Sequence, residues 1–421
     1  MELGVEIRYP PFTGQANHVR AVVSELRGLG HEVQLILGLP DGLWESTDLE
    51  TFRRVPPTAL DRGLLHGFER GVRRLQSTLN LPYLGLFEAV RFALAVRRGM
   101  RDCDVLYERF SWMGYGGSLA SRWLRIPLVI EDNGDHLKDL EAKGIAPEGL
   151  QRRLALRLMA GVVQRAALVI SSGEGWRQHF LARWECPDTK VTVVENGTSL
   201  VQLLSREQLQ AFQDNRPKGG VRLIYVGGFD PWHGIEVLLE AVRRARQQMD
   251  GLRLTLIGSG VGWAESRHLV DDLGLGEVVA FTGQLPVEQV ALELADADIG
   301  LSPYCGWSEY SGLKIFDYKA AGLPTIASGE AGQPATLEHG RTGWIVPPCD
   351  EVALTDAILL LAGDATLRRG LGRQARIEAE AIHSWARTAR QIEHSLLELV
   401  RRDASNQEIG RQPSAARGHH A

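Results

Sequence analysis

The feature that most constrains this fold is a strand–loop–helix–strand pattern that begins twice, at residue 3 and again at residue 221. The first copy has apolar runs at 3–9 and 31–37, and the second has runs at 221–226 and 252–257 around a helical pattern at 235–249. Near-continuous apolar strands joined through helices are typical of parallel sheets that are covered on both faces. The sequence therefore predicts two doubly wound α/β domains.

Short β-branched runs continue both halves of the chain. They lie at 105–107, 127–130, 168–171 and 191–194 in the first half, and at 278–281, 299–302, 325–327 and 343–346 in the second. The turn signal Asn196-Gly197-Thr198 separates the halves. We therefore expect an N-terminal domain over 1–198. Residues 402–421 have no apolar periodicity, which predicts a disordered tail.

Composition narrows the class of protein. The formal charge of −5 over 421 residues gives no bulk positive field for nucleic acid. No run reaches the roughly 18 apolar residues of a membrane span, and the first residues lack an export signal. The four cysteines (Cys103, Cys186, Cys305 and Cys349) are at least 44 residues apart without a CxxC pair. This predicts neither a disulfide framework nor a cysteine zinc site, and favours a cytoplasmic protein.

Residues 62–101 have a different pattern from the rest of the first half. Eight Arg accompany two acidic residues, Glu69 and Glu88, and apolar positions share one helical face. These positions are Leu64, Leu65, Phe68, Val72 and Leu75. One interpretation is a basic amphipathic surface that makes peripheral contact with anionic lipid. The other, favoured because Arg is abundant throughout, is a helical insertion packed on the first domain with a solvated Arg face.

Glycines follow the first two strands of the second half. Gly227 and Gly228 come after 221–226, and Gly258 comes after 252–257. Open α/β sheets bind ligands beyond the carboxyl ends of their strands, and amides near helix starts suit phosphate. The plain alternative is that these are turn glycines. A GxGxxG fingerprint is missing, which argues against a nicotinamide dinucleotide site.

The segment 308–324 is the most informative. It predicts a loop that carries Glu309, followed by a helix from about Gly312 that carries Lys314 and Asp317. Lys314 would stand in the first helical turn, where the helix dipole disfavours a cation. This placement indicates an anionic partner, a diphosphate near the amides of Gly312 and Leu313, while Asp317 could accept hydrogen bonds from a ribose diol. The alternative is an ordinary i,i+3 pair of Lys314 with Asp317.

In this order, the motifs resemble the retaining, nucleotide-sugar-dependent glycosyltransferases of family four, over about Leu3 to Leu399. Glu309 and Asp317 resemble the paired acids E-x7-E of that family, here E-x7-D. The other matching segments are Asn196-Gly197, Leu256-Ile-Gly-Ser-Gly260, Val279-Ala-Phe-Thr-Gly283, Ala295-Asp-Ala-Asp298, Ala320-Ala-Gly-Leu-Pro324 and His383-Ser-Trp385.

The resemblance implies the GT-B fold: two Rossmann-like domains that face a central cleft. It implies an acceptor-side domain over 1–198, a donor domain over 199–382 and a helix over 383–401 that crosses back to the first domain. The implied reaction moves a sugar, with retention, from a UDP- or GDP-linked donor to a hydroxyl of a glycan, lipid-linked glycan or small molecule. Alternatives are a phosphorylase- or epimerase-like enzyme on the same cleft, or a non-catalytic or weakly active subunit that binds a nucleotide sugar and partners another transferase.

The resemblance also implies roles for individual residues. Glu309 and Lys314 would be catalytic, and Asn133 and His136 are candidates to contact the acceptor or the sugar. Where the family has Arg and Lys in G-R-x4-K-G, this chain has Gly228 and His233, a Pro-Trp-His-Gly variant. His233 would help to bind phosphate only when protonated. No metal or other cofactor is expected, because Lys314 and amides would replace it. The expected donor-binding residues are Gly14, Gly227, Gly228, His233, Gly258, Phe281, Gly312, Leu313 and Asp317.

Overall fold

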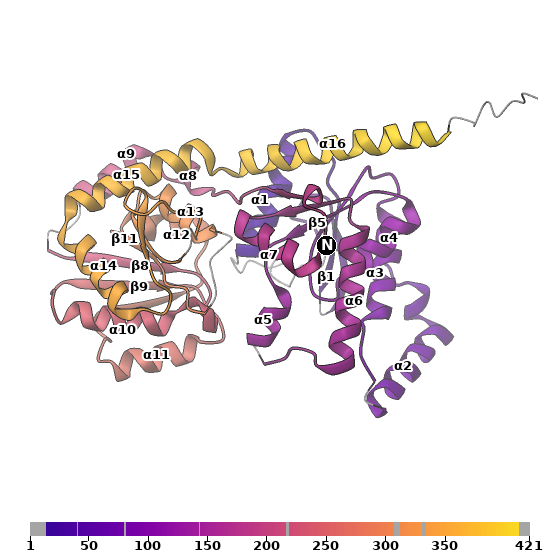
Figure 1. Ribbon diagram of the computed structural model, residues 1–421, viewed down its shortest axis with the longest axis horizontal. Helices are drawn as coiled ribbons and strands as arrows, with labels where there is room; N and C mark the ends of the chain where they lie inside the picture. The colour runs from indigo at the N-terminus through magenta and orange to yellow at the C-terminus, as the bar shows by residue number, and fades with distance from the viewer. Residues whose placement is uncertain are drawn as a thin grey trace, which may run out of the picture.

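The computed structural model describes residues 14–39, 41–79, 81–142, 144–215, 219–306, 312–330 and 334–411 (Figure 1). Figure 1 shows two lobes, with the helix α16 (Trp385–Arg411) extending from between them along the N-terminal lobe. The strand expected at 3–9 lies outside the described residues. Within them, no helix is both long enough and apolar enough to cross a bilayer.

Among the described residues, four parallel strands form a sheet of the N-terminal lobe, in the order β4-β5-β6-β7. They are β4 (Leu106–Arg109), β5 (Leu128–Asp132), β6 (Leu168–Ser171) and β7 (Val191–Val193). The helices of this lobe are α1 (Gly14–Gly28), α2 (Gly63–Thr78), α3 (Leu86–Gly99), α4 (Gly116–Leu124), α5 (His136–Ala142), α6 (Gly149–Arg165) and α7 (Glu174–Trp184), with 3-10 turns η2 (Ala59–Asp61) and η3 (Asp188–Lys190). Every residue of β5 is buried, as expected for a strand covered on both faces.

The strand expected at 31–37 begins at Leu35, and its expected parallel partner at 3–9 lies outside the described residues. Among the described residues, β1 (Leu35–Leu39) pairs antiparallel with β2 (Gly42–Ser46), and β2 pairs with β3 (Arg53–Arg54). Leu39 is opposite Gly42, so the link between β1 and β2 is a tight hairpin, which permits only antiparallel pairing. Gly42 has a φ of 131°, a backbone conformation that favours glycine.

In the described part of the C-terminal lobe, six strands form one sheet, all parallel, in the order β10-β9-β8-β11-β12-β13. They are β8 (Val221–Val226), β9 (Leu252–Ile257), β10 (Val279–Gly283), β11 (Ile299–Ser302), β12 (Thr325–Ser328) and β13 (Gly343–Val346). The other elements of the lobe are α8 (Leu200–Leu203), α9 (Arg206–Asp214), η4 (Pro231–His233), α10 (Ile235–Arg246), α11 (Trp263–Asp272), α12 (Val287–Ala295), α13 (Leu313–Ala320), α14 (Glu351–Gly363) and α15 (Ala365–Ile382). The predicted strands of this half are confirmed.

The two chain segments that pass between the lobes lie side by side. Thr198 N donates to the carbonyl oxygen of His383 at 3.2 Å. A Cβ on Gly197 would lie 2.4 Å from Trp385 N, so only glycine allows this approach. After Trp385, α16 packs against α1, and His31 Nε2 lies 2.7 Å from Glu393 Oε1. The helix therefore ties the end of the C-terminal lobe to the N-terminal lobe.

The prediction of a disordered tail from residue 402 is wrong for its first half. The helix α16 continues to Arg411, while residues 412–421 lie outside the described residues. Apolar periodicity is a signal of packing, whereas a helix that has already nucleated adds further residues without the cost of a new nucleus.

Residues 62–101 form two helices, which contact the N-terminal lobe in different ways. The helix α3 buries Ala89, Phe92 and Val96 in the N-terminal core. In α2 only Glu69 is buried, where it pairs with Arg91. Apolar side chains of α2 instead face solvent: Leu64 is 94% exposed, Phe68 63% and Leu75 56%.

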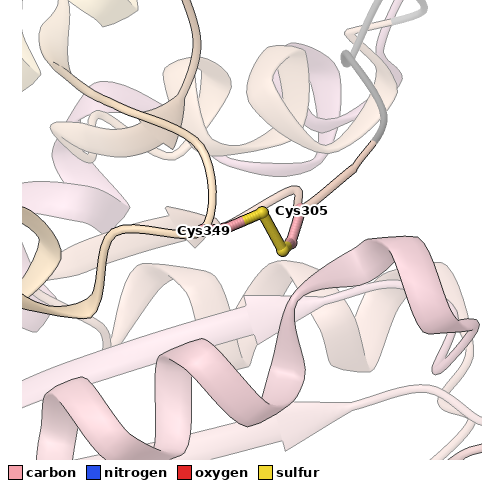
Figure 2. Close-up of a disulfide and its surroundings, with 2 residues drawn as sticks. All are labelled: Cys305 and Cys349. Atoms are coloured by element: carbon pink, nitrogen blue, oxygen red, sulfur yellow. A yellow bond between two sulfur atoms is a disulfide. The ribbon is translucent and has the colours of Figure 1, made fainter.

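The structure contains a disulfide that the cysteine spacing did not predict. Cys305 and Cys349, 44 residues apart in sequence, are bonded with their Cα atoms 4.8 Å apart (Figure 2). Cys305 follows β11 and Cys349 follows β13, and only β12 separates these strands in the sheet. Loops after parallel strands leave the same edge of a sheet. The strand order therefore brings the two cysteines close together, although they are far apart in sequence.

Candidate active site

Two glycine loops meet at the carboxyl edge of the C-terminal sheet. A Cβ on Gly258 would lie 1.8 Å from the carbonyl oxygen of Gly227, and Gly258 has a φ of 134°. No side chain fits there, so two backbone segments approach directly. Their amides are already used, because Gly227 N donates to Ile257 O and Gly258 N to Gly283 O, each at 2.9 Å. These glycines therefore shape the site, and their own N–H groups are not offered to a phosphate.

His233 ends the turn η4 and packs beside Gly228, whose added Cβ would lie 3.0 Å from His233 Cε1. Asp230 N donates to His233 Nδ1 at 3.2 Å, so that nitrogen carries no proton. Burial and the charge of Lys314 lower the pKa of His233 to about 2. The ring is consequently neutral near neutral pH, and it does not supply the cation that the Pro-Trp-His-Gly variant lacks.

Lys314 is buried in the first turn of α13. Its Nζ donates to the hydroxyl of Tyr304 at 3.3 Å and lies 4.3 Å from the Tyr304 ring centroid and 5.1 Å from that of Tyr225. Two aromatic faces therefore hold the ammonium. Gly312 caps the helix with a φ of 64°, and no acidic residue lies within the described first turn. The first turn of α13 thus combines a lysine charge with the positive end of the helix dipole.

Asp317 does not pair with Lys314, which excludes the i,i+3 alternative. Its Oδ1 accepts a 2.7 Å hydrogen bond from the Thr198 hydroxyl of the interdomain segment. Burial raises the pKa of Asp317 to about 7, against the lowering effect of this hydrogen bond. The carboxyl group is therefore partly ionised at neutral pH, and ionisation makes it an acceptor for hydroxyl donors.

The start of α13 also contacts the N-terminal lobe. Leu313 packs against an apolar cluster that includes Val22 and Trp385. A Cβ on Gly312 would lie 2.7 Å from Thr336 Cγ2, so this turn is tightly enclosed. Glu309 lies outside the described residues. Gly14 is the first residue of α1.

Phe281 lies in an aromatic cluster on β10. Its ring centroid is 5.1 Å from that of Trp263 and 6.2 Å from that of Phe229, and the Arg267 guanidinium lies 5.8 Å from it. Phe229 and Trp263 follow the two glycine loops directly in sequence, a signal that the sequence analysis did not use. The cluster therefore joins β10 to residues that follow both glycine loops.

The two acceptor-side candidates have different environments. Asn133 Nδ2 donates to Glu131 Oε1 at 2.5 Å. The His136 Nε2 lies 2.6 Å from the carbonyl oxygen of Phe110, and burial lowers the pKa of the ring. Asn133 therefore belongs to a charged network around Glu131, whereas His136 is bonded to the interior of its own lobe.

The sequence analysis missed the centre of that network. His18 Nε2 lies 2.7 Å from Glu131 Oε1, and His18 Nδ1 lies 2.8 Å from Asn196 Oδ1. Tyr107 donates its hydroxyl to Glu131 at 2.5 Å. Burial alone would raise the pKa of Glu131, but the His18 and Arg109 charges and the hydrogen bonds hold it well below its usual range. The sequence did offer one signal for this network: Glu131, a charged residue, directly follows the apolar strand run 127–130.

Comparisons with known proteins identify the family to which the chain belongs. The family described as "Glycosyl transferase 4-like domain" matches residues 13–197, and "Glycosyl transferases group 1" matches residues 220–364. The chain is 26% identical over 313 residues to D-inositol 3-phosphate glycosyltransferase of Corynebacterium glutamicum, covering 70% of this chain and 72% of that protein. It is 27% identical over 333 residues to the amylovoran biosynthesis glycosyltransferase AmsK of Erwinia amylovora, covering 77% and 76%.

Solved structures show the same fold. Sucrose-phosphate synthase from Thermosynechococcus elongatus aligns with a TM-score of 0.66 and 24% identity, over 92% of this chain and 93% of that one. HepE from Anabaena, in complex with UDP, aligns with a TM-score of 0.61 and 21% identity, over 76% and 85%. HepE has also been solved with UDP-glucose. The expected GT-B arrangement of two Rossmann-like domains is confirmed, and the chain belongs to the nucleotide-sugar glycosyltransferases of family four.

Proposed function

We propose that this glycosyltransferase moves a sugar from a nucleoside diphosphate sugar to a hydroxyl acceptor with retention at the anomeric carbon. The observation that carries the proposal is the position of Lys314, buried between Tyr225 and Tyr304 in the first turn of α13. An ammonium held there stabilises negative charge, and a nucleoside diphosphate develops negative charge as it leaves the sugar.

The remaining donor roles follow from the neighbours of Lys314. Asp317 accepts from the ribose diol once it is ionised, and Gly227 and Gly258 shape the site by letting two backbone segments meet there. The strand around Phe281 holds the base edge. Glu309 fixes a sugar hydroxyl near the reacting face, and closure of the two lobes excludes water.

The reaction proposed is metal-independent. His233 is neutral, so charge compensation falls on Lys314 and the positive end of α13. An ammonium and helix amides stabilise a leaving diphosphate without a bound cation. The donor base first to be tested is uracil, because HepE, which shares the fold, was solved with UDP and with UDP-glucose; a GDP-linked donor is the second.

We also propose that the acceptor is presented at the cytoplasmic face of a membrane, as a lipid-linked glycan or similar molecule. The apolar face of α2 (Leu64, Phe68 and Leu75) is exposed, and Arg70 and Arg74 elsewhere on the same helix are exposed as well. Among the described residues, no acidic side chain is within ion-pair distance of either arginine. A helix with an exposed apolar face and exposed cations has the composition that binds an anionic lipid surface.

The test is a binding and transfer experiment on the full chain. Calorimetry with UDP and GDP identifies the base, and incubation with the corresponding labelled nucleotide sugars and candidate acceptors measures transfer. We expect an α-linked product from an α-linked donor, identified by proton NMR. A product of inverted configuration would contradict the retaining mechanism. Nucleotide-sugar binding without transfer or donor hydrolysis would instead support a non-catalytic subunit.

A further inference from the structure

The disulfide joins two loops at the edge of the candidate active site (Figure 2). Each cysteine is the third residue after its strand, Cys305 after β11 and Cys349 after β13. Neither cysteine belongs to the residues that bind the donor in the proposed function. The bond is therefore a feature of this chain that the reaction itself does not require.

The loop that carries Cys305 is fitted closely against η4. A Cβ on Gly234 would lie 1.6 Å from the carbonyl oxygen of Pro303, so glycine is required for this contact. Cys305 N donates to the carbonyl oxygen of Trp232 at 2.9 Å. Residues 303–305 thus lie on the turn that contains His233.

Tyr304 is held between these two anchors. Its ring centroid lies 5.1 Å from that of His233. On its other side the ring and hydroxyl contact the Lys314 ammonium, at 4.3 Å and 3.3 Å. Tyr304, which contacts Lys314, therefore directly precedes the disulfide cysteine Cys305 in the sequence.

The second cysteine, Cys349, lies directly before the N-terminal cap of α14. Cys349 has a φ of 58°, a conformation that few residues with a side chain adopt. Asp350 follows it as the cap of α14, with Oδ1 accepting from Ala353 N at 2.9 Å. The disulfide therefore connects the Tyr304 loop to the start of a capped helix, and restricts the positions that the loop can take.

We propose that the Cys305–Cys349 disulfide is a positioning element of the donor site, which holds Tyr304 against Lys314, and that its reduction weakens binding of the donor's diphosphate. This inference rests on the proposed function, because it takes Lys314 as the diphosphate ligand. Tyr304 is likewise a positioning residue, since it acts through Lys314.

Reduction requires a dithiol reductant. A thiolate of the reductant attacks the sulfur of Cys349, which is exposed. The protein S–S bond breaks and two S–H groups form, taking two electrons and two protons in total. The reductant's two sulfurs become a disulfide, so the exchange balances.

The experiment compares UDP and UMP binding to the full chain by calorimetry, before and after treatment with dithiothreitol, and after reoxidation. All measurements use a Cys103→Ala/Cys186→Ala background, in which only Cys305 and Cys349 can respond. Non-reducing peptide mapping checks their bond in each sample. GDP and GMP replace the uridine nucleotides if GDP binds more tightly.

We expect the reduced protein to bind the diphosphate about five- to tenfold more weakly, the size of a partly buried cation–π contact. Binding of the monophosphate, which lacks the β-phosphate, should change less than twofold, and reoxidation should restore the original affinity. The Cys305→Ser/Cys349→Ser variant should behave like the reduced protein. In a Tyr304→Ala variant the affinity is already lowered, and reduction should lower it no further.

The other outcomes overturn the inference. An unchanged affinity for the diphosphate after reduction, or peptides that show no Cys305–Cys349 link, would show that the disulfide does not position Tyr304. Equal losses for the diphosphate and monophosphate would show a general structural role instead. If neither nucleoside diphosphate binds the oxidised protein, the proposed function fails and this inference fails with it.

Discussion

The hydroxyl of Thr198 donates a 2.7 Å hydrogen bond to Oδ1 of Asp317 and so joins the interdomain segment to α13. The backbone N–H of the same threonine is bonded to His383, on the second segment that passes between the lobes. The carboxyl group that we propose binds the donor ribose is thus linked directly to the segment that joins the two lobes. In the proposed mechanism, the closure of the lobes and the ionisation of Asp317 would therefore both affect this carboxyl group.

The first prediction concerns the pH dependence of donor binding. Because the pKa of Asp317 is raised to about 7, nucleotide affinity should fall as the pH decreases through that value and the carboxylate is protonated. The Thr198 hydrogen bond lowers this pKa, so Thr198→Val should move the midpoint of the affinity profile to higher pH. Calorimetry between pH 5.5 and about 9 measures the midpoint.

A control for this variant is Thr325→Val. The Thr325 hydroxyl is buried in β12 and has no hydrogen-bond partner in the described part of the chain, so its removal should leave the midpoint unchanged. A Thr198→Val profile that coincides with that of the unaltered protein would show that Asp317 does not control the pH dependence.

The second prediction concerns the stability of the ligand-free protein. In the folded state the pKa of Asp317 is about 7, against 3.8 for an ordinary aspartate. The folded chain therefore retains this proton where the unfolded chain has released it, and the contribution of Asp317 to stability is lost as the pH rises from about 4 to 7. Asp317→Asn cannot ionise, so its stability relative to the unaltered protein, measured by urea unfolding, should increase over that range. A constant difference would contradict the raised pKa.

Much of the sheet architecture could be predicted from the sequence, because apolar runs such as Val221–Val226 are local signals. The β1–β2 hairpin could not, since its apolar run looks the same whether the strand pairs in parallel or antiparallel. The tight turn at Gly42 is what makes β2 pair antiparallel with β1.

The site was only partly predictable, for a different physical reason. Lys314 and Asp317 share one helix, so their spacing carried information. His18 and Glu131 lie on α1 and at the end of β5, and only tertiary packing brings them together. The neutrality of His233 results from burial beside Lys314, which sequence spacing does not report.

The third prediction concerns the main charge stabiliser. Lys314→Ala should reduce turnover by about 100- to 1,000-fold, by analogy with the loss of one oxyanion donor. Lys314→Arg keeps the positive charge and should retain more activity than the alanine variant. Steady-state kinetics with saturating donor separates kcat from KM. An alanine variant with full turnover would remove Lys314 from the mechanism.

The fourth prediction concerns metal ions. Since Lys314 and the positive end of α13 compensate the diphosphate charge in the proposed mechanism, EDTA should leave the transfer rate unchanged. The rate is measured after dialysis against the chelator and again after addition of Mg²⁺. A complete loss that Mg²⁺ restores would contradict the metal-independent mechanism.

The last prediction concerns membrane contact through α2. The full chain should cosediment with vesicles that contain phosphatidylglycerol, and less with vesicles of phosphatidylcholine alone. Arg70→Ala/Arg74→Ala should weaken binding about tenfold or more, since each cation near an anionic surface contributes about 1 kcal/mol. Leu64→Ser/Phe68→Ser should weaken it through loss of buried apolar area. Ile145, 65% exposed but outside α2, provides the matched control: Ile145→Ser should bind normally. Equal binding by all variants would show that α2 is not the contact, because neither its charge nor its apolar face would then contribute.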